Sequence, residues 1–522
     1  MSSGARMSPV DVTWLRMDRP NNHMVIVGVI VLREPVDLDR LERTLEARLL
    51  AYDRFRRKVD ERGGFHWRDD ARFDIGRHIR RARLPGAAGK AELQRLVGEL
   101  AARPLHPNHP LWQIHIVERY EEGVAVILRI HHAIGDGGAM IRVLLDLTDE
   151  TPDAPLHGVE PPPEAPEDEA REDAFSPPWD ILAPLIEKVE GGVKVSAEAA
   201  RSAFDLARHP TGATKLLREG ANVAAELAWL MMMPTDTPTR LKGSLCGDKR
   251  VAWSAPIPLP EVKAVGHALG CTVNDMLLAS FAGALKSYLE AKGEPTHGVE
   301  VRALAPIDLR PPGRARSLGN QFGIVAVELP VGMSNPLARL GEVRRRMLAL
   351  KRSYEPVVTL GLVTALGYGP KMLQDRLFDL LLSRATAVMT NVPGPQRPLY
   401  LGGAPIDQIM FWVPQSGEIG MGVSLLSFNN RVQLGLITDA ALTPDPDEIV
   451  KHFQPEFEQL LYHALLNMGA EAEPAAEAQA EDAPAPPPRQ RKRKPAVLRV
   501  NGEAPPAKPR RRSRAQETAL PN

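Results

Sequence analysis

The chain has 522 residues, of which 43% are hydrophobic and 25% charged, a composition ordinary for a folded protein and a length that suits two domains. Its formal net charge is zero, but eleven Lys or Arg against two Glu follow position 488, so the preceding residues carry about minus nine. Two cysteines, no signal-peptide core and no run of about twenty apolar residues exclude a disulfide framework and favour a cytoplasmic protein that does not span a membrane.

Residues 1–150 are predicted to form an α/β domain. Short β-branched runs at 24–32 and 124–130 have the composition of strands. Between them, 37–52 and 90–104 carry apolar residues at helical spacing. This alternation of strands and helices is typical of a sheet covered by helices.

The middle of the chain has a different composition. Residues 151–180 are rich in proline and acidic residues, which bury too little apolar surface to order a chain, so we expect a linker. Residues 181–245 follow as a helical connector, interrupted at Pro210. It includes the apolar cluster 228–233, which we expect to pack on a core.

A second α/β domain is predicted at 246–468. It contains several strand-like runs and a hairpin that turns at Asn429 and Asn430, and it closes with a helix at 446–468.

Residues 469–522 are predicted to be a disordered tail, because Ala, Pro and Glu give way there to clustered arginines. The basic end of this tail is a candidate for peripheral contact with an anionic surface, the inner membrane or a lipid body. Nucleic acid is the less favoured partner, a solvated tail is an equal alternative, and the oligomeric state stays open.

The segment RIHHAIGDGGAM, residues 129–140, places two histidines directly after the strand-like run. A histidine at a strand end lies where clefts form, and neutral imidazole can take a proton from a hydroxyl group and return it one step later. Asp136 lies close enough in sequence to orient an imidazole or to pair with an arginine. Helical spacing resumes after the glycines of this segment.

The histidine pair has other possible roles. Adjacent residues on an extended chain point to opposite faces, which disfavours a shared metal ion, and we predict no metal site. For His131 alone, a role in the core is the favoured interpretation. The sequence has no phosphate-binding loop motif, and neither cysteine stands in a catalytic motif.

HHAIGDG matches the HHxxxDG signature of the CoA-dependent acyltransferase superfamily. Further blocks, in order, resemble the bacterial wax ester synthase/acyl-CoA:diacylglycerol acyltransferase family over about residues 7–465: MSPVDVTWLRMDRPNNHMVIVGVIVL, ARPLHPNHPLWQIHIVE, CTVNDMLLASFAGALKSYL, PIDLRPPG, LGNQFG and TNVPGP. The resemblance implies an α/β fold of two chloramphenicol-acetyltransferase-like domains. Their mixed sheets would be flanked by helices, with an active-site channel between the domains.

The resemblance also implies roles for the motif residues. His132 matches the general base and His131 its companion, while Asp136 and Gly137 match the pair that fixes the turn. The residues implied to bind substrate or support the site are Asn274, Asp275, Arg310 and Asn320.

From the residues themselves, several of these assignments have simpler alternatives. Asn274 begins a helical run and suits an N-cap, and Asn320 is first a loop residue. Arg310 is a candidate partner of Asp136 or an ordinary surface arginine. His106 and Asp308 depart from the family pattern, which puts the substrate preference in doubt.

The expected activity is transfer of a long-chain acyl group from acyl-CoA to diacylglycerol or a fatty alcohol, with acyl-CoA as co-substrate and no other cofactor. The products would be triacylglycerol or wax ester, and the sequence leaves both acceptors open. Two alternatives are a non-catalytic protein of the same fold at a lipid or polymer surface, and a free-standing condensation-type acyltransferase.

Overall fold

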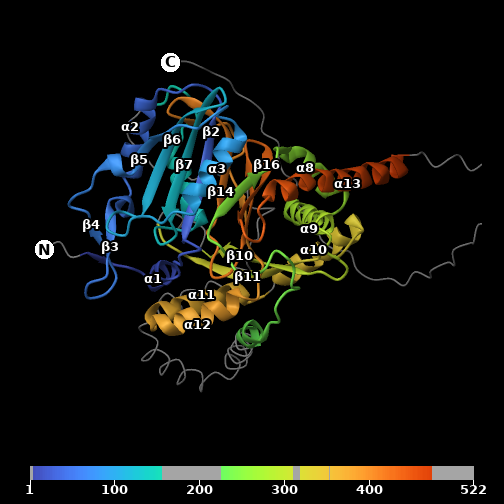
Figure 1. The fold of residues 1–522 in the computed structure, drawn as a ribbon. Helices are drawn as coiled ribbons and strands as arrows, with labels where there is room; N and C mark the ends of the chain where they lie inside the picture. The colour runs from blue at the N-terminus through green and yellow to red at the C-terminus, as the bar shows by residue number, and fades with distance from the viewer. Residues whose placement is uncertain (1–3, 156–224, 310–317, 352, 473–522) are drawn as a thin grey trace, which may run out of the picture. The chain divides into compact units, whose positions relative to one another are not determined.

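The computed structural model describes residues 4–155, 225–309, 318–351 and 353–472. Two mixed sheets form its framework (Figure 1). The first has six strands, in the order β13-β14-β2-β7-β6-β5, and only the β5–β6 pair is parallel. Its strands are β2 (Val25–Leu32), β5 (Ile79–Ala82), β6 (Trp112–Tyr120), β7 (Gly123–His131), β13 (Tyr400–Leu401) and β14 (Ala404–Trp412).

The second sheet has seven strands, in the order β11-β10-β12-β15-β16-β8, with β9 paired to β16. Its β12 is parallel to both β10 and β15, and its other pairs are antiparallel. The strands are β8 (Lys249–Trp253), β9 (Ile257–Pro258), β10 (Val301–Asp308), β11 (Phe322–Leu329), β12 (Ala387–Pro393), β15 (Met421–Phe428) and β16 (Arg431–Asp439). A third, small sheet joins β1 (Ala5–Arg6), β4 (His66–Asp69) and β3 (Arg57–Asp60).

The buried side chains of the helices and sheets form three cores. Figure 1 shows where these helices lie. The first sheet packs with α2 (Leu38–Leu49), α3 (Lys90–Ala101) and α4 (Gly137–Leu147). The second packs with α8 (Leu259–Ala268), α9 (Val273–Ala291), α10 (Pro336–Leu350) and α13 (Pro446–Ala472). The third core joins α1 (Pro9–Arg16), α11 (Glu355–Tyr368) and α12 (Lys371–Leu382).

Sheet membership does not follow chain order. Strands β13 and β14 belong to the segment 246–468, yet β14 pairs with β2, with Trp412 opposite Val27 and Ile409 opposite Ile30. The described residues up to position 470 accordingly form one compact unit. Both halves of the chain therefore contribute to the sheet that ends at the histidine pair.

Several predicted elements are confirmed. The runs 24–32 and 124–130 are β2 and β7, and the predicted helices between them are α2 and α3. The hairpin turns at Asn429 and Asn430, whose φ angles of 48° and 57° are those of a type I′ turn. The closing helix is α13.

Other predicted segments are described only in part or not at all. The linker 151–180 and the connector 181–245 lie largely outside the described residues, and the tail does so almost entirely. Of the cluster 228–233, Leu230 and Met233 are buried whereas Met232 is 81% exposed, so its packing on a core is partial. Within the described ranges no single helix has the length and composition of a membrane span; only α8 and α9 together pass that test, across a 96° bend.

Candidate active site

The histidine pair lies where β7 leaves the sheet. The His131 N–H donates to the Leu111 carbonyl at 2.9 Å, and the His132 N–H donates to the Met24 carbonyl at 2.7 Å. Both backbones are thus fixed by the ends of neighbouring strands and loops. The chain then turns, and α4 begins at Gly137.

Asp136 is the N-cap of α4. One carboxylate oxygen accepts from the Ala139 N–H at 3.0 Å, and the other accepts from the Gln321 N–H at 3.0 Å. The Asp136 N–H donates to the Gly319 carbonyl at 3.3 Å. Asp136 therefore ties the motif turn to the loop that precedes β11. Its expected partner Arg310 lies outside the described residues.

The His132 ring is enclosed by aromatic side chains. It is 5% exposed, and its centroid lies 4.9 Å from that of Trp14 and 5.5 Å from that of Phe322. Burial lowers the pKa of His132 to about 4, although the nearby Asp136 carboxylate opposes this. The imidazole is consequently neutral at cellular pH. Among the described residues, its Nδ1 has no hydrogen-bond partner.

His131 faces a different partner. Its Nδ1 accepts from the Ala133 N–H at 3.1 Å, so in the neutral ring Nε2 carries the proton and donates to Asp18 Oδ2 at 3.3 Å. Burial opposes ionisation of Asp18, but hydrogen bonds from His131 and from the Met24 N–H outweigh it and lower the pKa of Asp18. His131 therefore holds the segment before β2 against the motif.

Three buried or partly buried polar residues, Asp11, Arg54 and Asn320, hold the motif turn through hydrogen bonds, and we call them the clamp. Asn320 Nδ2 donates to the His132 carbonyl at 3.0 Å and to Asp11 Oδ1 at 2.8 Å. Arg54 donates to the carbonyls of Ala133 and Ile134 at 3.0 and 2.9 Å, and to Asp11 Oδ2 at 2.9 Å. Three consecutive carbonyls of the turn are thereby held. Asp11 itself is fully buried.

Sequence reasoning missed Asp11, Arg54, Asp18 and the aromatic wall around His132. Asp11 and Trp14 do lie in the block MSPVDVTW, which was a usable signal. Phe322 also lies in a quoted block, LGNQFG, whereas Arg54 stands in none of them. Only the tertiary structure brings them to the turn.

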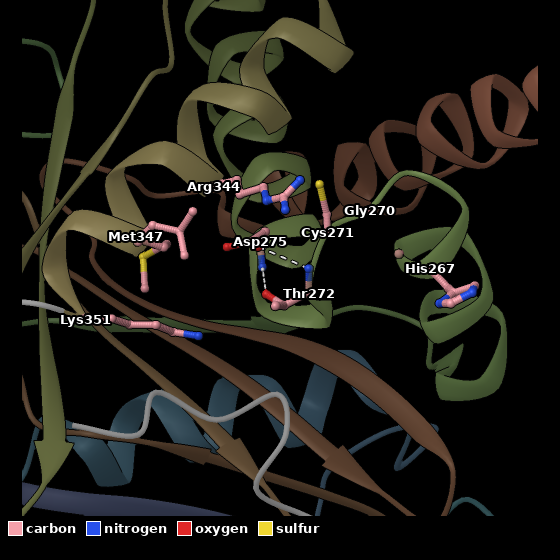
Figure 2. Close-up of a pocket in the computed structure, with 10 residues that line it drawn as sticks. His267, Gly270, Cys271, Thr272, Asp275, Arg344, Met347 and Lys351 are labelled. Atoms are coloured by element: carbon pink, nitrogen blue, oxygen red, sulfur yellow. Dashed lines mark hydrogen bonds between the residues drawn. The ribbon is translucent and has the colours of Figure 1, made fainter. Parts of the chain in front are cut away.

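Asn274 and Asp275 lie apart from the His132 cavity lining, at the start of α9. The N-cap of α9 is Thr272, not Asn274 as expected, because Asp275 completes a capping box with it. Figure 2 shows both hydrogen bonds: Asp275 accepts from the Thr272 N–H at 3.1 Å, and the Asp275 N–H donates to Thr272 Oγ1 at 3.2 Å. The Asp275 carboxylate is therefore engaged in capping. Asn274 Oδ1 instead accepts from Asn391 Nδ2 at 2.7 Å.

Three neighbouring cavities lie near the motif. The His132 ring lines one of about 60 Å³, and an apolar one of about 70 Å³ lies beside α4. Asn274 lines the largest, of about 490 Å³. Each pair of these cavities shares a lining residue, so they are neighbours: the His132 cavity shares Pro306 with the largest and Val413 with the apolar one, and the other two share Ile141.

A separate cavity of about 280 Å³ lies between α8, α9 and α10 (Figure 2). Arg344, Cys271 and Lys351 line it, and it shares Met347 with the largest cavity. In the part of the chain that the structure describes, no three His, Cys, Asp or Glu side chains gather as metal ligands.

Comparison with known proteins shows the family of this chain. Residues 7–277 match the model of the wax ester synthase/diacylglycerol acyltransferase catalytic domain, and residues 318–461 match the C-terminal domain of the same family. The chain belongs to the wax ester synthase/diacylglycerol acyltransferase family. Trp14 and His132 come from the first matched region, and Phe322 and Asn320 from the second, so the site needs both.

Curated relatives agree with this family, and solved structures share the fold. The chain is 28% identical over 477 residues to "Putative diacyglycerol O-acyltransferase Rv0221" of Mycobacterium tuberculosis, covering 87% of this chain and 95% of the relative. The fold is similar to that of a wax ester synthase/diacylglycerol acyltransferase from Marinobacter aquaeolei VT8, with a TM-score of 0.61, 20% identity and coverage of 88% and 99% of the two chains.

A condensation domain of the calcium-dependent antibiotic synthetase shares the fold at a TM-score of 0.54 and 15% identity, with 89% of this chain and 96% of that one covered. The expected α/β fold, two mixed sheets flanked by helices as in these domains, is confirmed.

Proposed function

We propose that this member of the wax ester synthase/diacylglycerol acyltransferase family transfers a long-chain acyl group from acyl-CoA to diacylglycerol or a fatty alcohol, with His132 as general base. The observation that carries the proposal is the buried, neutral imidazole of His132, a residue that lines a cavity with two further cavities as its neighbours. A general base must be unprotonated when the hydroxyl arrives, and burial ensures this.

The reaction requires one imidazole and no covalent intermediate. The acceptor hydroxyl gives its proton to His132 while its oxygen attacks the carbonyl carbon of the thioester. The C–O bond forms, the C–S bond then breaks, and the CoA thiolate takes the proton back from His132. Atoms and charges balance with acyl-CoA as the only co-substrate.

The low pKa of His132 suits the second half of this cycle. A buried imidazolium is disfavoured, so it returns its proton readily to the more basic thiolate. Asp136 stabilises the transient cation through its charge, because it raises the pKa of His132 against the effect of burial. We assign Asp136 and Gly137 to the shape of the turn and His131 to its anchoring on Asp18.

The supporting residues fall into two groups. Asn320 is a positioning residue, since it holds the His132 carbonyl. Asn274 lines the largest cavity, whose wall also includes Lys263 and Arg397, so this cavity suits the polyanionic CoA. Peripheral contact with an anionic lipid surface through the basic tail stays a prediction.

Condensation-type transfer to an amine is a second candidate, favoured by the shared fold of condensation domains. A panel of acyl donors and acceptors distinguishes transfer to a hydroxyl group from transfer to an amine. Palmitoyl-CoA and a palmitoyl carrier protein serve as donors, and hexadecanol, dipalmitoylglycerol and hexadecylamine as acceptors, with thiol release and extracted products measured. We expect thiol release from palmitoyl-CoA with the hydroxyl acceptors.

His132→Gln should lower kcat by a thousandfold or more, within the range general-base loss produces. His115→Gln is the matched control, because His115 is also buried on a strand of the first sheet, with its pKa lowered to about 4. Full activity in His132→Gln would refute the proposal. Turnover with hexadecylamine alone would favour the condensation reaction.

A further inference from the structure

We propose that the cavity between α8, α9 and α10 binds a phosphomonoester through Arg344 and Lys351. Its volume of about 280 Å³ is close to the roughly 300 Å³ at which small-molecule sites begin. His132 does not line it, so this site is separate from the proposed base. Two sources of the ligand are the 3′-phosphate of the CoA donor and free phosphate, and only the first source rests on the proposed function.

Two cationic side chains line this cavity from α10. Arg344 lies on that helix, and Lys351 directly follows its last residue. In the view of Figure 2 the two side chains lie on either side of Thr272 and Asp275, at the start of α9. A recess with cationic groups in its wall concentrates positive potential and favours an anionic ligand.

Neighbouring arginines on α10 are neutralised by a carboxylate. Arg345 and Arg346 each pair with Glu342 at 2.6 Å. Among the described residues, neither Arg344 nor Lys351 forms a salt bridge. The charges of these two side chains therefore remain available to a ligand in the cavity.

The carboxylate that lines the cavity belongs to Asp275 and is already engaged. It is buried and accepts from the Thr272 N–H at 3.1 Å in the capping box. The same box occupies the Asp275 N–H, which donates to Thr272 Oγ1 at 3.2 Å. An anion would accordingly be held by the side chains of α10. Two cations against one carboxylate leave the lining with a net positive charge.

The turn between α8 and α9 places the Arg344 guanidinium. Gly270 in this turn has a φ of 66°, in the left-handed region that favours glycine. A Cβ there would lie 3.5 Å from Arg344 Nη1, so the guanidinium lies close to the turn. A guanidinium can donate two parallel hydrogen bonds to a phosphate, and the lysine adds a point charge. A phosphomonoester, with a charge of about −1.5 to −2 at pH 7, matches two cations better than a diester does.

The position of the cavity favours the CoA donor as the source. Met347 lines both this cavity and the largest one, which we assign to CoA, so the two are neighbours. The 3′-phosphate stands on the ribose of CoA, far along the molecule from the thioester. It would contribute equally to binding before and during the reaction. We therefore expect this site to lower KM for the donor and to leave kcat unchanged.

Arg344→Gln and Lys351→Gln each remove one charge from the cavity. Arg345→Gln is the matched control, because Arg345 is the next residue on α10, has a side chain that is 68% exposed and does not line the cavity. Calorimetric titrations of the full chain use CoA, dephospho-CoA and inorganic phosphate. We expect both cavity variants to weaken CoA binding about tenfold, as loss of a charge-assisted hydrogen bond does, and to change dephospho-CoA binding less than about twofold. The basic tail is present in every variant, so its contribution cancels.

Each pattern of binding decides the assignment. Weaker binding of CoA but not of dephospho-CoA assigns the 3′-phosphate to the cavity. Weaker binding of inorganic phosphate with unchanged CoA binding supports the site and identifies free phosphate as its ligand. Equal weakening for CoA and dephospho-CoA would contradict a phosphomonoester site, and so would cavity variants that bind all three ligands like Arg345→Gln.

Kinetics with hexadecanol as acceptor give a second readout for the CoA source. KM for palmitoyl-CoA should rise about tenfold in Arg344→Gln at unchanged kcat, whereas KM for palmitoyl-dephospho-CoA should stay within about twofold. Equal changes of KM for the two donors would reject the 3′-phosphate as the ligand. The titrations need no turnover, so a wild type that transfers no acyl group would overturn the proposed function while the binding data still decide the cavity.

Discussion

Burial of His132 should make the stability of the protein depend on pH in a way that one substitution removes. The pKa of this imidazole is about 4 in the fold against 6.5 in a model compound. The unfolded chain therefore binds a proton more tightly than the folded chain. The stability that depends on a neutral His132 is fully present above pH 6.5, and it is lost as the pH falls from 6.5 to about 4.

The size of the effect follows from the two pKa values. Their difference corresponds to roughly 3 kcal/mol once the pH is below both, and to roughly 2 kcal/mol at pH 5. His132→Gln keeps a polar side chain of similar length but binds no proton. The free energy of unfolding of the wild type should thus fall by about 2 kcal/mol more than that of His132→Gln between pH 7.5 and 5.

Urea unfolding followed by tryptophan fluorescence measures this difference, because Trp14 lies against the His132 ring. Other histidines with lowered pKa values, such as His78 and His115, contribute to both proteins and cancel. Parallel profiles of unfolding free energy against pH in the two proteins would show that His132 is not desolvated in the fold. They would contradict the assignment of His132 as a neutral base.

Two further substitutions distinguish the contribution of the motif turn to activity from that of the capping box of α9. Asn320→Ala removes a donor to both Asp11 and the His132 carbonyl, so unfolding free energy in urea should fall by about 2–4 kcal/mol and kcat should fall with it. Asp275→Ala breaks the capping box, so the same measurement should show a loss of about 1 kcal/mol, while kcat for palmitoyl-CoA stays within about twofold. A large loss of kcat in Asp275→Ala at unchanged stability would instead indicate a direct role in the reaction.

Local patterns predicted the elements that carry the motif, and tertiary contacts supplied the rest of the site. The run 124–130, the turn and α4 follow one another, so periodicity and glycine positions were sufficient. The loop residue Asn320 was named, but its contact with His132 depends on a fold that brings residues 188 positions apart together. The error at Asn274 was local: Thr272 and Asp275 have the S/T-x-x-D spacing of a capping box, which outweighs an Asn one residue inside the helix.

The pairing of strands between the two halves of the chain was not predicted, for a related reason. β14 is apolar and strand-like, but nothing in its own sequence states that its partner is β2 rather than a neighbour in the second half of the chain. Pairing is decided by which open edge the chain can reach after β12. This crossing places Val413, which directly follows β14, in the lining of both the His132 cavity and the apolar cavity.

Arg54 offers the sharpest test of whether the clamp positions His132 or merely stabilises the fold. Its guanidinium reaches two turn carbonyls and Asp11 at once and lies 5.1 Å from the Trp67 ring. A lysine ammonium has no planar fork and cannot reproduce this set, so Arg54→Lys should cost about 2–4 kcal/mol of stability and leave the turn less restrained.

The matched control is Arg48→Lys. The side chain of Arg48, on α2, is 9% exposed against 19% for Arg54, and it pairs with Asp149 at 2.7 Å. Among the described residues, no hydrogen bond joins it to the turn. Both variants should lose stability in urea. Only Arg54→Lys should lower kcat, by tenfold or more, with KM for palmitoyl-CoA unchanged, because the base is displaced while the cavities that hold the substrates stay intact. Equal kcat losses in the two variants would mean that activity follows global stability, and the clamp would have no separate part in placing the imidazole.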